Sequence, residues 1–359
     1  MCDSGKPDKI DLNNEDLPDV NNSNKIVIDL DDLPVEDSAT KAYPGLSSPS
    51  TPQFSKGSKA SVSNVFWHLA LAGLIGGVIG WAFTEIFMDD TYDIYQTYAE
   101  VLVEMSIFAA LIGGAIGSCL GAVEGITSQV SQKTYRGIAV GLAFGFGGGA
   151  AGGFLGQIIY SMLGGGYIVN LIPQLFIRSI AWGLVGLFIG LGQGIGSGGG
   201  KKTTNGLLGG LVGGLVGGFL FDIIGLAADT GTISRAVAIP IIGASTGLGI
   251  SLVQEIRKEA WLKVLQGATA GKEYIIFGDK TLIGSSPKCD IVLVKDNSVK
   301  TNHAEIRLEN GAYIINDLNS PDGVWLNNAR VSNQRLKNGD NLRIGNYSLQ
   351  YFERGIKEV

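Results

Sequence analysis

Few side chains in this chain have a type or spacing that suits catalysis or metal binding. The candidates are two histidines and three isolated cysteines: His68, His303, Cys2, Cys119 and Cys289. The cysteines lack the spacing of a zinc or redox site. The run 199–204, Gly-Gly-Lys-Lys-Thr-Thr, is similar to a phosphate-binding loop, but no β-strand pattern precedes it, so we interpret it as a connection between helices. The sequence therefore predicts a protein that is not an enzyme and that uses no cofactor or metal ion.

Four short motifs near the C-terminus contain residues that can contact a ligand. They are 281–284 (TLIG), 289–293 (CDIVL), 302–306 (NHAEI) and 317–327 (DLNSPDGVWLN). Around them, short runs of Val, Ile, Leu and Tyr alternate with Gly, Asn and Asp, which is the pattern of a β-sandwich. We therefore predict an all-β domain over residues 261–353.

In this order and at these spacings, the four motifs resemble those of a forkhead-associated (FHA) domain. The resemblance implies a sandwich of about eleven strands whose loops at one end bind phosphothreonine peptides. The loop residues that it marks as partner-binding are Gly284, Ser285, Lys300, Thr301, His303, Asp322, Gly323 and Asn327. In the family, the positions of Gly284, His303 and Gly323 serve loop geometry, so we expect His303 to hydrogen bond to the backbone of a neighbouring loop.

The phosphate-binding positions depart from the family pattern. The family has an Arg after the first glycine, a Ser three residues before the His and an Asn before the last glycine. This chain has Ser285, Lys300 and Asp322 there, and Thr301 replaces a residue that is often basic. An Arg binds phosphate through two aligned, charge-assisted hydrogen bonds that a Ser hydroxyl cannot reproduce, and Lys300 offers only a point charge. We therefore predict an intact scaffold with a degenerate phosphate site.

Six long apolar segments precede this domain. They cover residues 65–87, 105–126, 137–163, 172–196, 205–226 and 236–254. Each is close to the roughly 20 residues that cross a bilayer core. The interval Gly73–Gly249 also holds 42 of the 54 glycines, which are tolerated where helices pack in lipid. The pattern predicts a membrane all-α bundle of about six transmembrane helices over residues 65–255.

The apolar segments also contain internal repeats. Gly76 and Gly80 align with the glycine pairs 113 and 117, 186 and 190, and 243 and 247, and a second set matches 152–155 with 217–220. Duplication of a helical hairpin explains both sets. Because a four-residue spacing stacks small residues on one helix face, we predict that Gly113, Gly117, Gly186 and Gly190 lie at helix contacts, as in a glycine zipper.

Basic residues flank alternate ends of these segments. One side has these nine cations: Lys56, Lys59, Lys133, Arg136, Lys201, Lys202, Arg257, Lys258 and Lys263. The other side is poor in Lys and Arg. By the positive-inside rule, both termini are cytoplasmic in a multi-pass protein of the bacterial inner membrane. The start of the chain lacks the apolar core of a secretory signal, so we expect the first apolar helix to direct insertion.

Residues 1–62 form an acidic segment that we predict to be a disordered cytoplasmic tail. The first sixty residues carry a net charge of −5 of the chain's −6 and no aromatic cluster. Ile-Asp-Leu followed by Asp-Leu-Pro occurs twice, at 10–18 and 28–34. The repeat suits either docking in a partner's groove or a solvated low-complexity tail.

Two classes of function remain open. In the first, the bundle anchors the sandwich at the cytoplasmic face, where it acts as a signalling or scaffold module that binds a protein, such as a phosphoprotein. In the second, the bundle is a channel or transporter regulated by the sandwich, with ionisable residues near the helix ends: Glu85, Glu104, Glu124, Arg178, Asp222, Arg235 and Glu255. The bilayer is the other expected partner, a basic nucleic-acid footprint is missing, and the oligomeric state is left open.

Overall fold

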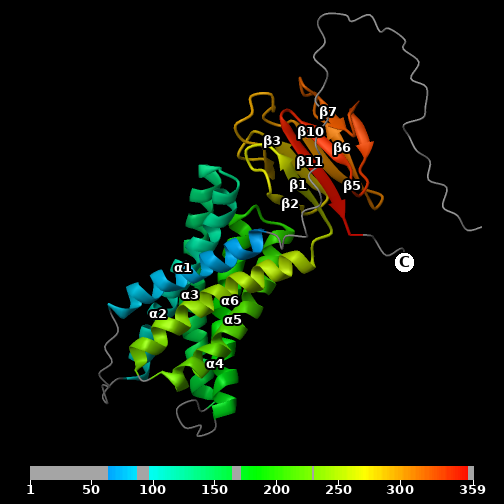
Figure 1. Ribbon diagram of the computed structural model, residues 1–359. Helices are drawn as coiled ribbons and strands as arrows, with labels where there is room; N and C mark the ends of the chain where they lie inside the picture. Colours follow the sequence, from blue (N-terminus) through cyan, green and yellow to red (C-terminus); the bar gives the residue numbers. More distant parts are fainter. Residues whose placement is uncertain (1–63, 87–96, 164–170, 229, 355–359) are drawn as a thin grey trace, which may run out of the picture. The chain divides into compact units, whose positions relative to one another are not determined.

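The computed structural model describes residues 64–86, 97–163, 171–228 and 230–354. The tail expected at 1–62 lies outside these residues. Six helices come first (Figure 1): α1 (Asn64–Glu85), α2 (Tyr98–Thr127), α3 (Ser131–Met162), α4 (Leu171–Gly196), α5 (Lys201–Ala227) and α6 (Gly231–Ile256). The predicted number of helices is thus found in the described chain, and residues 197–200 connect α4 to α5.

All six helices begin earlier than their apolar runs, and the difference is largest for α2 and α3. α2 starts at Tyr98 rather than at 105, because Thr97 and Glu100 form a capping box. The Thr97 amide donates to the Glu100 carboxylate at 2.6 Å, and the Glu100 amide donates to the Thr97 hydroxyl at 3.4 Å. α3 starts at Ser131 rather than at 137 with a polar first turn. Hydropathy misses the first turn of α2 because a capping box, not apolar burial, stabilises it, whereas no side-chain hydrogen bond caps α3.

The six helices form a closed arrangement in which α6 returns to pack against α1. The even-numbered helices are the inner ones, with at least half of their most apolar stretch buried, against about a third for the odd-numbered helices. Their central side chains are 0–2% exposed: Ile112, Ile116, Leu120, Val185, Ile189, Ile239, Ile242 and Ile250. Aliphatic side chains therefore fill the middle of the bundle.

Glycines allow α2 and α3 to touch through their backbones. A Cβ added to Gly113 or Gly117 would collide with the carbonyl oxygen of Gly145 or Gly141. Such close approach leaves no room for a side chain and maximises van der Waals contact between the helices. The α2–α3 pair is therefore held by a two-sided row of glycines.

The α4–α5 pair repeats this contact. A Cβ on Gly186 or Gly190 would meet the carbonyl oxygen of Gly210 or Gly206. The repeated sequence thus corresponds to repeated packing of a helical hairpin. A third pair joins α6 to α1, where Gly243 lies against Gly73.

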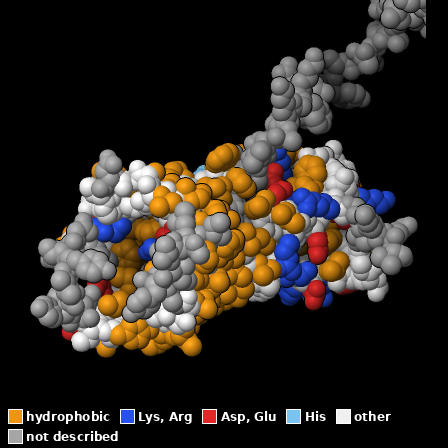
Figure 2. Space-filling model, turned by 90° about the horizontal axis from the view of Figure 1, so that it is seen from below, with side chains coloured by type: hydrophobic (Ala, Val, Ile, Leu, Met, Phe, Trp, Pro, Cys, Tyr) orange, Lys and Arg blue, Asp and Glu red, His pale blue; other side chains and the backbone are white. Residues whose placement is uncertain are grey.

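Large apolar side chains cover the outside of the helices. Trp67 is 63% exposed, and further exposed side chains are Leu71, Phe83, Leu142, Phe146 and Val216. Figure 2 shows hydrophobic side chains over most of this face of the helices. Each of the six helices is long and apolar enough to cross a bilayer.

Ionisable residues near one end of the bundle pair with one another. Arg178 of α4 lies 3.1 Å from Asp222 of α5. Arg235 of α6 donates to Glu85 of α1 at 2.8 Å. Each pair joins the two helices of one closely packed pair, so these charges link helices within the bundle.

The C-terminal part is a sandwich of eleven strands, as the FHA resemblance implied. The strands are β1 (Ala260–Gln266), β2 (Glu273–Ile276), β3 (Lys280–Gly284), β4 (Ile291–Val292), β5 (Ala304–Glu309), β6 (Ala312–Asp317), β7 (Val324–Leu326), β8 (Ala329–Val331), β9 (Asn333–Arg335), β10 (Asn341–Ile344) and β11 (Tyr347–Glu353). One sheet has the order β2-β1-β11-β10-β7-β8 and the other β4-β3-β5-β6-β9. Alternate residues of the strands face a shared core that includes Leu262, Ile283, Ile315, Leu342 and Tyr351.

Candidate ligand-binding loops of the sandwich

Two loops at one end of the sandwich are joined through their backbones. The Ser285 amide donates to the Lys300 carbonyl at 3.1 Å, and the Ser286 amide donates to the Thr301 carbonyl at 3.2 Å. Gly284 makes this contact possible, because a Cβ there would collide with the Thr301 carbonyl. The loops β3–β4 and β4–β5 therefore form one unit.

His303 ties the third loop to this unit. Its ring is fully buried, and its Nδ1 accepts a hydrogen bond from the Lys300 amide at 3.1 Å. Its Nε2 lies 3.3 Å from the Gly323 carbonyl in the β6–β7 loop. An acceptor at Nδ1 and a carbonyl opposite Nε2 together require the neutral tautomer with its hydrogen on Nε2. His303 thus has the geometry of a loop-stabilising residue, not of a ligand contact.

The three substituted positions all lie exposed on this end. Ser285, Lys300 and Asp322 come from the β3–β4, β4–β5 and β6–β7 loops, and Thr301 beside Lys300 is also exposed. The Lys300 ammonium donates to the carbonyls of Leu318 and Asn319 at 3.1 and 3.3 Å. Part of its hydrogen-bonding capacity is therefore used within the protein.

Asn327 lies elsewhere, at the opposite end of β7 from Gly323. Its amide group donates to Asp340 at 2.8 Å, and its side-chain oxygen accepts from the Asn341 amide at 3.0 Å. Asn327 and Asn328 have φ of 48° and 69°, which is the conformation of a two-residue hairpin turn. We therefore assign Asn327 to the turn rather than to the loop site.

Arg330 is a loop-site cation that sequence reasoning missed. It pairs with Trp325 across the β7–β8 hairpin, so its side chain returns towards the β6–β7 loop. Its guanidinium lies 3.5 Å from the Pro321 carbonyl and against Gly323, where a Cβ would collide with it. The Asn-Asn turn was the signal, because it sets the register that brings Arg330 beside Pro321 and Gly323.

Asp296 stabilises the β4–β5 loop from within. Although burial opposes the charged form, hydrogen bonds from Ser298 and from the Asn346 backbone and side chain lower the pKa of its carboxyl. The Asn346 amide donates to it at 2.7 Å and the Ser298 hydroxyl at 2.6 Å. The loop that carries Lys300 is thus tied to the β10–β11 turn.

The geometry agrees with the comparisons with known proteins. The FHA domain family model matches residues 281–345, which begin after the six helices. The glycogen accumulation regulator GarA of Mycolicibacterium smegmatis is 36% identical over 92 residues, which are 26% of this chain and 58% of the relative. The oxoglutarate dehydrogenase inhibitor of Corynebacterium diphtheriae is 32% identical over 111 residues, 31% of this chain and 76% of the relative.

A solved structure is also similar to the sandwich. The FHA domain of a Chlamydia trachomatis protein is 28% identical, with a TM-score of 0.26, over 27% of this chain and 99% of that chain. The chain spans a little over half the length of the GarA relatives that it matches. FHA domains are protein-interaction modules. The FHA family model and the corynebacterial relative, which is covered over 76% of its length, show that the chain belongs to the FHA-domain family.

Proposed function

We propose that this protein is anchored in a membrane by its six helices and that its FHA domain recruits a protein at the membrane surface, with weak recognition of phosphothreonine. The observation that carries the proposal is the composition of the loop site. The site keeps the FHA geometry but places Ser285, Lys300 and Asp322 where the family resemblance implies Arg, Ser and Asn.

Electrostatics support weak phosphate binding. A phosphate bound here meets the Asp322 carboxylate and lacks the two parallel hydrogen bonds of an Arg at position 285. Lys300 and Arg330 supply positive charge, but both already contact carbonyls of the β6–β7 loop. Hydrogen bonds to charged groups contribute about 1.5 to 3 kcal/mol, so the missing contacts correspond to a roughly ten- to hundredfold loss of affinity. The same cations suit an acidic side chain of a partner.

The outer faces of the helices support a membrane anchor. Water-soluble monomers rarely expose apolar patches larger than a few hundred Å². In this chain many large apolar side chains on the outside of the helices are exposed, and Trp67, Phe83 and Phe146 are each about half exposed or more. Lipid would cover these faces at no hydrophobic cost. The Lys and Arg asymmetry supports an orientation with both termini in the cytoplasm.

The relatives support a regulatory interaction. GarA is named as a regulator of glycogen accumulation and the corynebacterial protein as an inhibitor of oxoglutarate dehydrogenase. Both names describe proteins that act on another protein or pathway. We extend from them to this chain only the role of binding a protein partner, and not the identity of that partner.

The channel or transporter alternative receives less support. Tightly packed isoleucines occupy the middle of the bundle. Four of the candidate ionisable residues form two ion pairs between helices, Arg178 with Asp222 and Arg235 with Glu85. A pathway needs polar side chains or water along its course. An anchor needs only the close packing that the glycines provide.

Affinity purification from membranes tests the proposal. We expect the tagged full-length chain to stay in the membrane pellet after alkaline carbonate washing and to retain a partner that is lost when residues 258–359 are removed. The matched control is Glu309→Gln, an exposed change at the end of β5 away from the loop site. Release by carbonate would contradict the anchor, and a partner set unchanged by the truncation would contradict recruitment by the FHA domain.

A further inference from the structure

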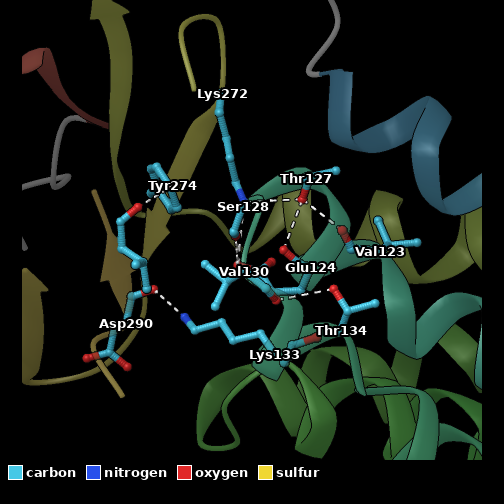
Figure 3. Close-up of polar contacts among 12 residues, drawn as sticks. Val123, Glu124, Thr127, Ser128, Val130, Lys133, Thr134, Lys272, Tyr274 and Asp290 are labelled. Carbon is cyan, nitrogen blue, oxygen red and sulfur yellow. Dashed lines mark hydrogen bonds and ion pairs between the residues drawn. The ribbon is translucent and has the colours of Figure 1, made fainter. Parts of the chain in front are cut away.

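The short connector between α2 and α3 carries a buried apolar side chain. Val130 follows Gln129, whose φ of 56° lies in the left-handed region, and it is only 7% exposed although it is in a loop. It packs with Cys289 and Val292 of the sandwich, with Leu282 and Val294 at the edge. Figure 3 shows Val130 of the connector together with Lys272, Tyr274 and Asp290 of the sandwich. An apolar contact of this kind is a point of attachment, because either partner alone would expose it to water.

Polar contacts run in both directions around Val130. From the bundle, the Lys133 ammonium donates to the carbonyls of Cys289 and Asp290 at 2.8 and 3.2 Å. From the sandwich, Lys272 extends towards the end of α2 (Figure 3) and donates to the hydroxyls of Thr127, at 3.1 Å, and Ser128. The two lysines thus cross the same contact from opposite sides.

The contact is matched in charge as well as in shape. The Lys272 side chain is 8% exposed and lies 3.7 Å from the Glu124 carboxylate. Lys295 donates to the Gln129 side chain at 2.8 Å, and that side chain donates to the Ala268 carbonyl at 3.3 Å. A buried ammonium is costly unless it is paired and hydrogen bonded, so the pairing favours this one arrangement over others.

The docked segment is the loop that also builds the ligand end. Residues 285–290 contact Val130 of the connector through Cys289, and Lys133 in the first turn of α3 through Cys289 and Asp290. The Cys289 thiol lies 3.2 Å from the Thr301 carbonyl, and the Cys289 amide donates to the Ser286 carbonyl at 3.0 Å. Ser285 and Ser286 in turn pair with Lys300 and Thr301. One short loop is therefore held on one side by the helices and on the other by the ligand-binding loops.

We propose that the α2–α3 connector is an intramolecular docking surface for the FHA domain and that docking orders the β3–β4 loop of the ligand site. Undocking exposes Val130 and Cys289, removes the lysine contacts and loosens the loop that presents Ser285. By linkage, a ligand that orders this loop favours docking to the same extent that docking favours the ligand. This inference depends neither on the partner nor on the membrane.

Disulfide trapping tests the docking. In a Cys2→Ser, Cys119→Ser background, Val130→Cys places a thiol beside native Cys289 in the purified full-length chain. Mild oxidation followed by proteolysis and mass spectrometry should detect the 130–289 disulfide forming at least tenfold faster than with Gln132→Cys, an exposed neighbour in the same segment. An equal or slower rate for Val130→Cys would overturn the docking surface.

Hydrogen exchange tests the effect on the loop. Lys133→Ala and Val130→Asp both weaken docking from the helix side without changing the sandwich. We expect amides of residues 285–290 to exchange about tenfold faster in both variants, with exchange in β5 and β6 unchanged, and no change in Gln132→Ala. Unchanged exchange at 285–290 in Lys133→Ala, in a chain that elutes like the unmodified protein, would refute the ordering of the loop by docking.

Discussion

Three residues set the chemistry of the loop site. Ser285 removes a planar cation, Asp322 adds a carboxylate, and Lys300 adds a charge that contacts Leu318 and Asn319. Gly284 and His303 keep the loops in place around them through close backbone contacts. The scaffold therefore keeps the FHA fold while the ligand-binding positions depart from the family pattern, and restoring the chemistry should not require a change of fold.

Phosphothreonine binding should return when the three positions are changed together. We expect Ser285→Arg/Lys300→Ser/Asp322→Asn to bind a phosphothreonine peptide library ten- to hundredfold more tightly than the unmodified chain, because a bidentate cation and two neutral donors replace a repelling site. Calorimetric titration of the full-length chain measures this. The dephosphorylated library is the control. Phosphate-dependent micromolar binding by the unmodified chain would contradict the degenerate site.

Lys272 should make stability depend on pH. Burial, helped by Lys202 and Lys133 and opposed by Glu124, lowers the pKa of Lys272 to about 8. The unfolded chain titrates near 10.4, so between these values it binds more protons than the folded chain. The free energy of unfolding therefore rises with pH across this window.

Thermal unfolding in detergent from pH 7 to 10 measures this effect. Lys272→Met keeps the length and apolar stem of the side chain but cannot titrate. We expect the melting temperature of the unmodified chain, relative to that of Lys272→Met at the same pH, to increase from pH 8 to 10. If the difference in melting temperature does not change between pH 8 and 10, the pKa of Lys272 is not lowered in the folded chain.

The helices of the bundle pack most closely where a glycine of one helix lies against the backbone of the next helix. Gly117 and Gly190 hold equivalent places in the α2–α3 and α4–α5 pairs, each against a carbonyl of its neighbour. The nearby Gly147 on α3 has no atom within 4 Å of an added Cβ. The same residue type in the same bundle therefore has two roles, a contact and an open surface position.

Alanine substitution should separate these roles. We expect Gly117→Ala and Gly190→Ala each to destabilise the bundle by about 1 to 3 kcal/mol, because the new Cβ forces the helices apart. Gly147→Ala should be neutral or slightly stabilising, since it removes a flexible residue from a helix. Thermal unfolding of the three variants in detergent measures the difference. Similar stability for all three would place Gly117 and Gly190 outside the contacts.

At the scale of the whole molecule, a short connection joins the last helix to the FHA domain. α6 ends at Ile256 and β1 begins at Ala260. Between them Lys258 is buried, pairs with Glu273 at 2.7 Å and lies over the Trp261 ring. The link from helix to sandwich is therefore packed as well as short, which supports a domain held close to the end of the bundle.

Labelling of single cysteines in intact cells tests this topology, with Cys2, Cys119 and Cys289 replaced by Ser. We expect a membrane-impermeant maleimide added from outside to modify Asp93→Cys but not Gln334→Cys, an exposed position on β9. After permeabilisation both should react. If only Gln334→Cys were modified in intact cells, the chain would have the opposite orientation to the one proposed.

The sequence by itself determined the number of helices, the sandwich and most of the loop site. These depend on local features: apolar runs, strand alternation and motifs whose glycines allow close contacts or turns at Gly284 and Gly323. Glycine spacing also predicted a repeated hairpin, because residues four apart lie on one helix face.

Only the tertiary structure decided which neighbour each feature meets. Gly76 of α1 aligns with Gly113 in sequence but lies against α2, whereas Gly73 makes the contact with α6. Arg330 reaches the loop site through the register of a hairpin, and Lys272 reaches Glu124 from 148 positions further along the chain. Spacing selects a helix face or a strand side, but the partner of that face depends on packing between segments that are distant in sequence.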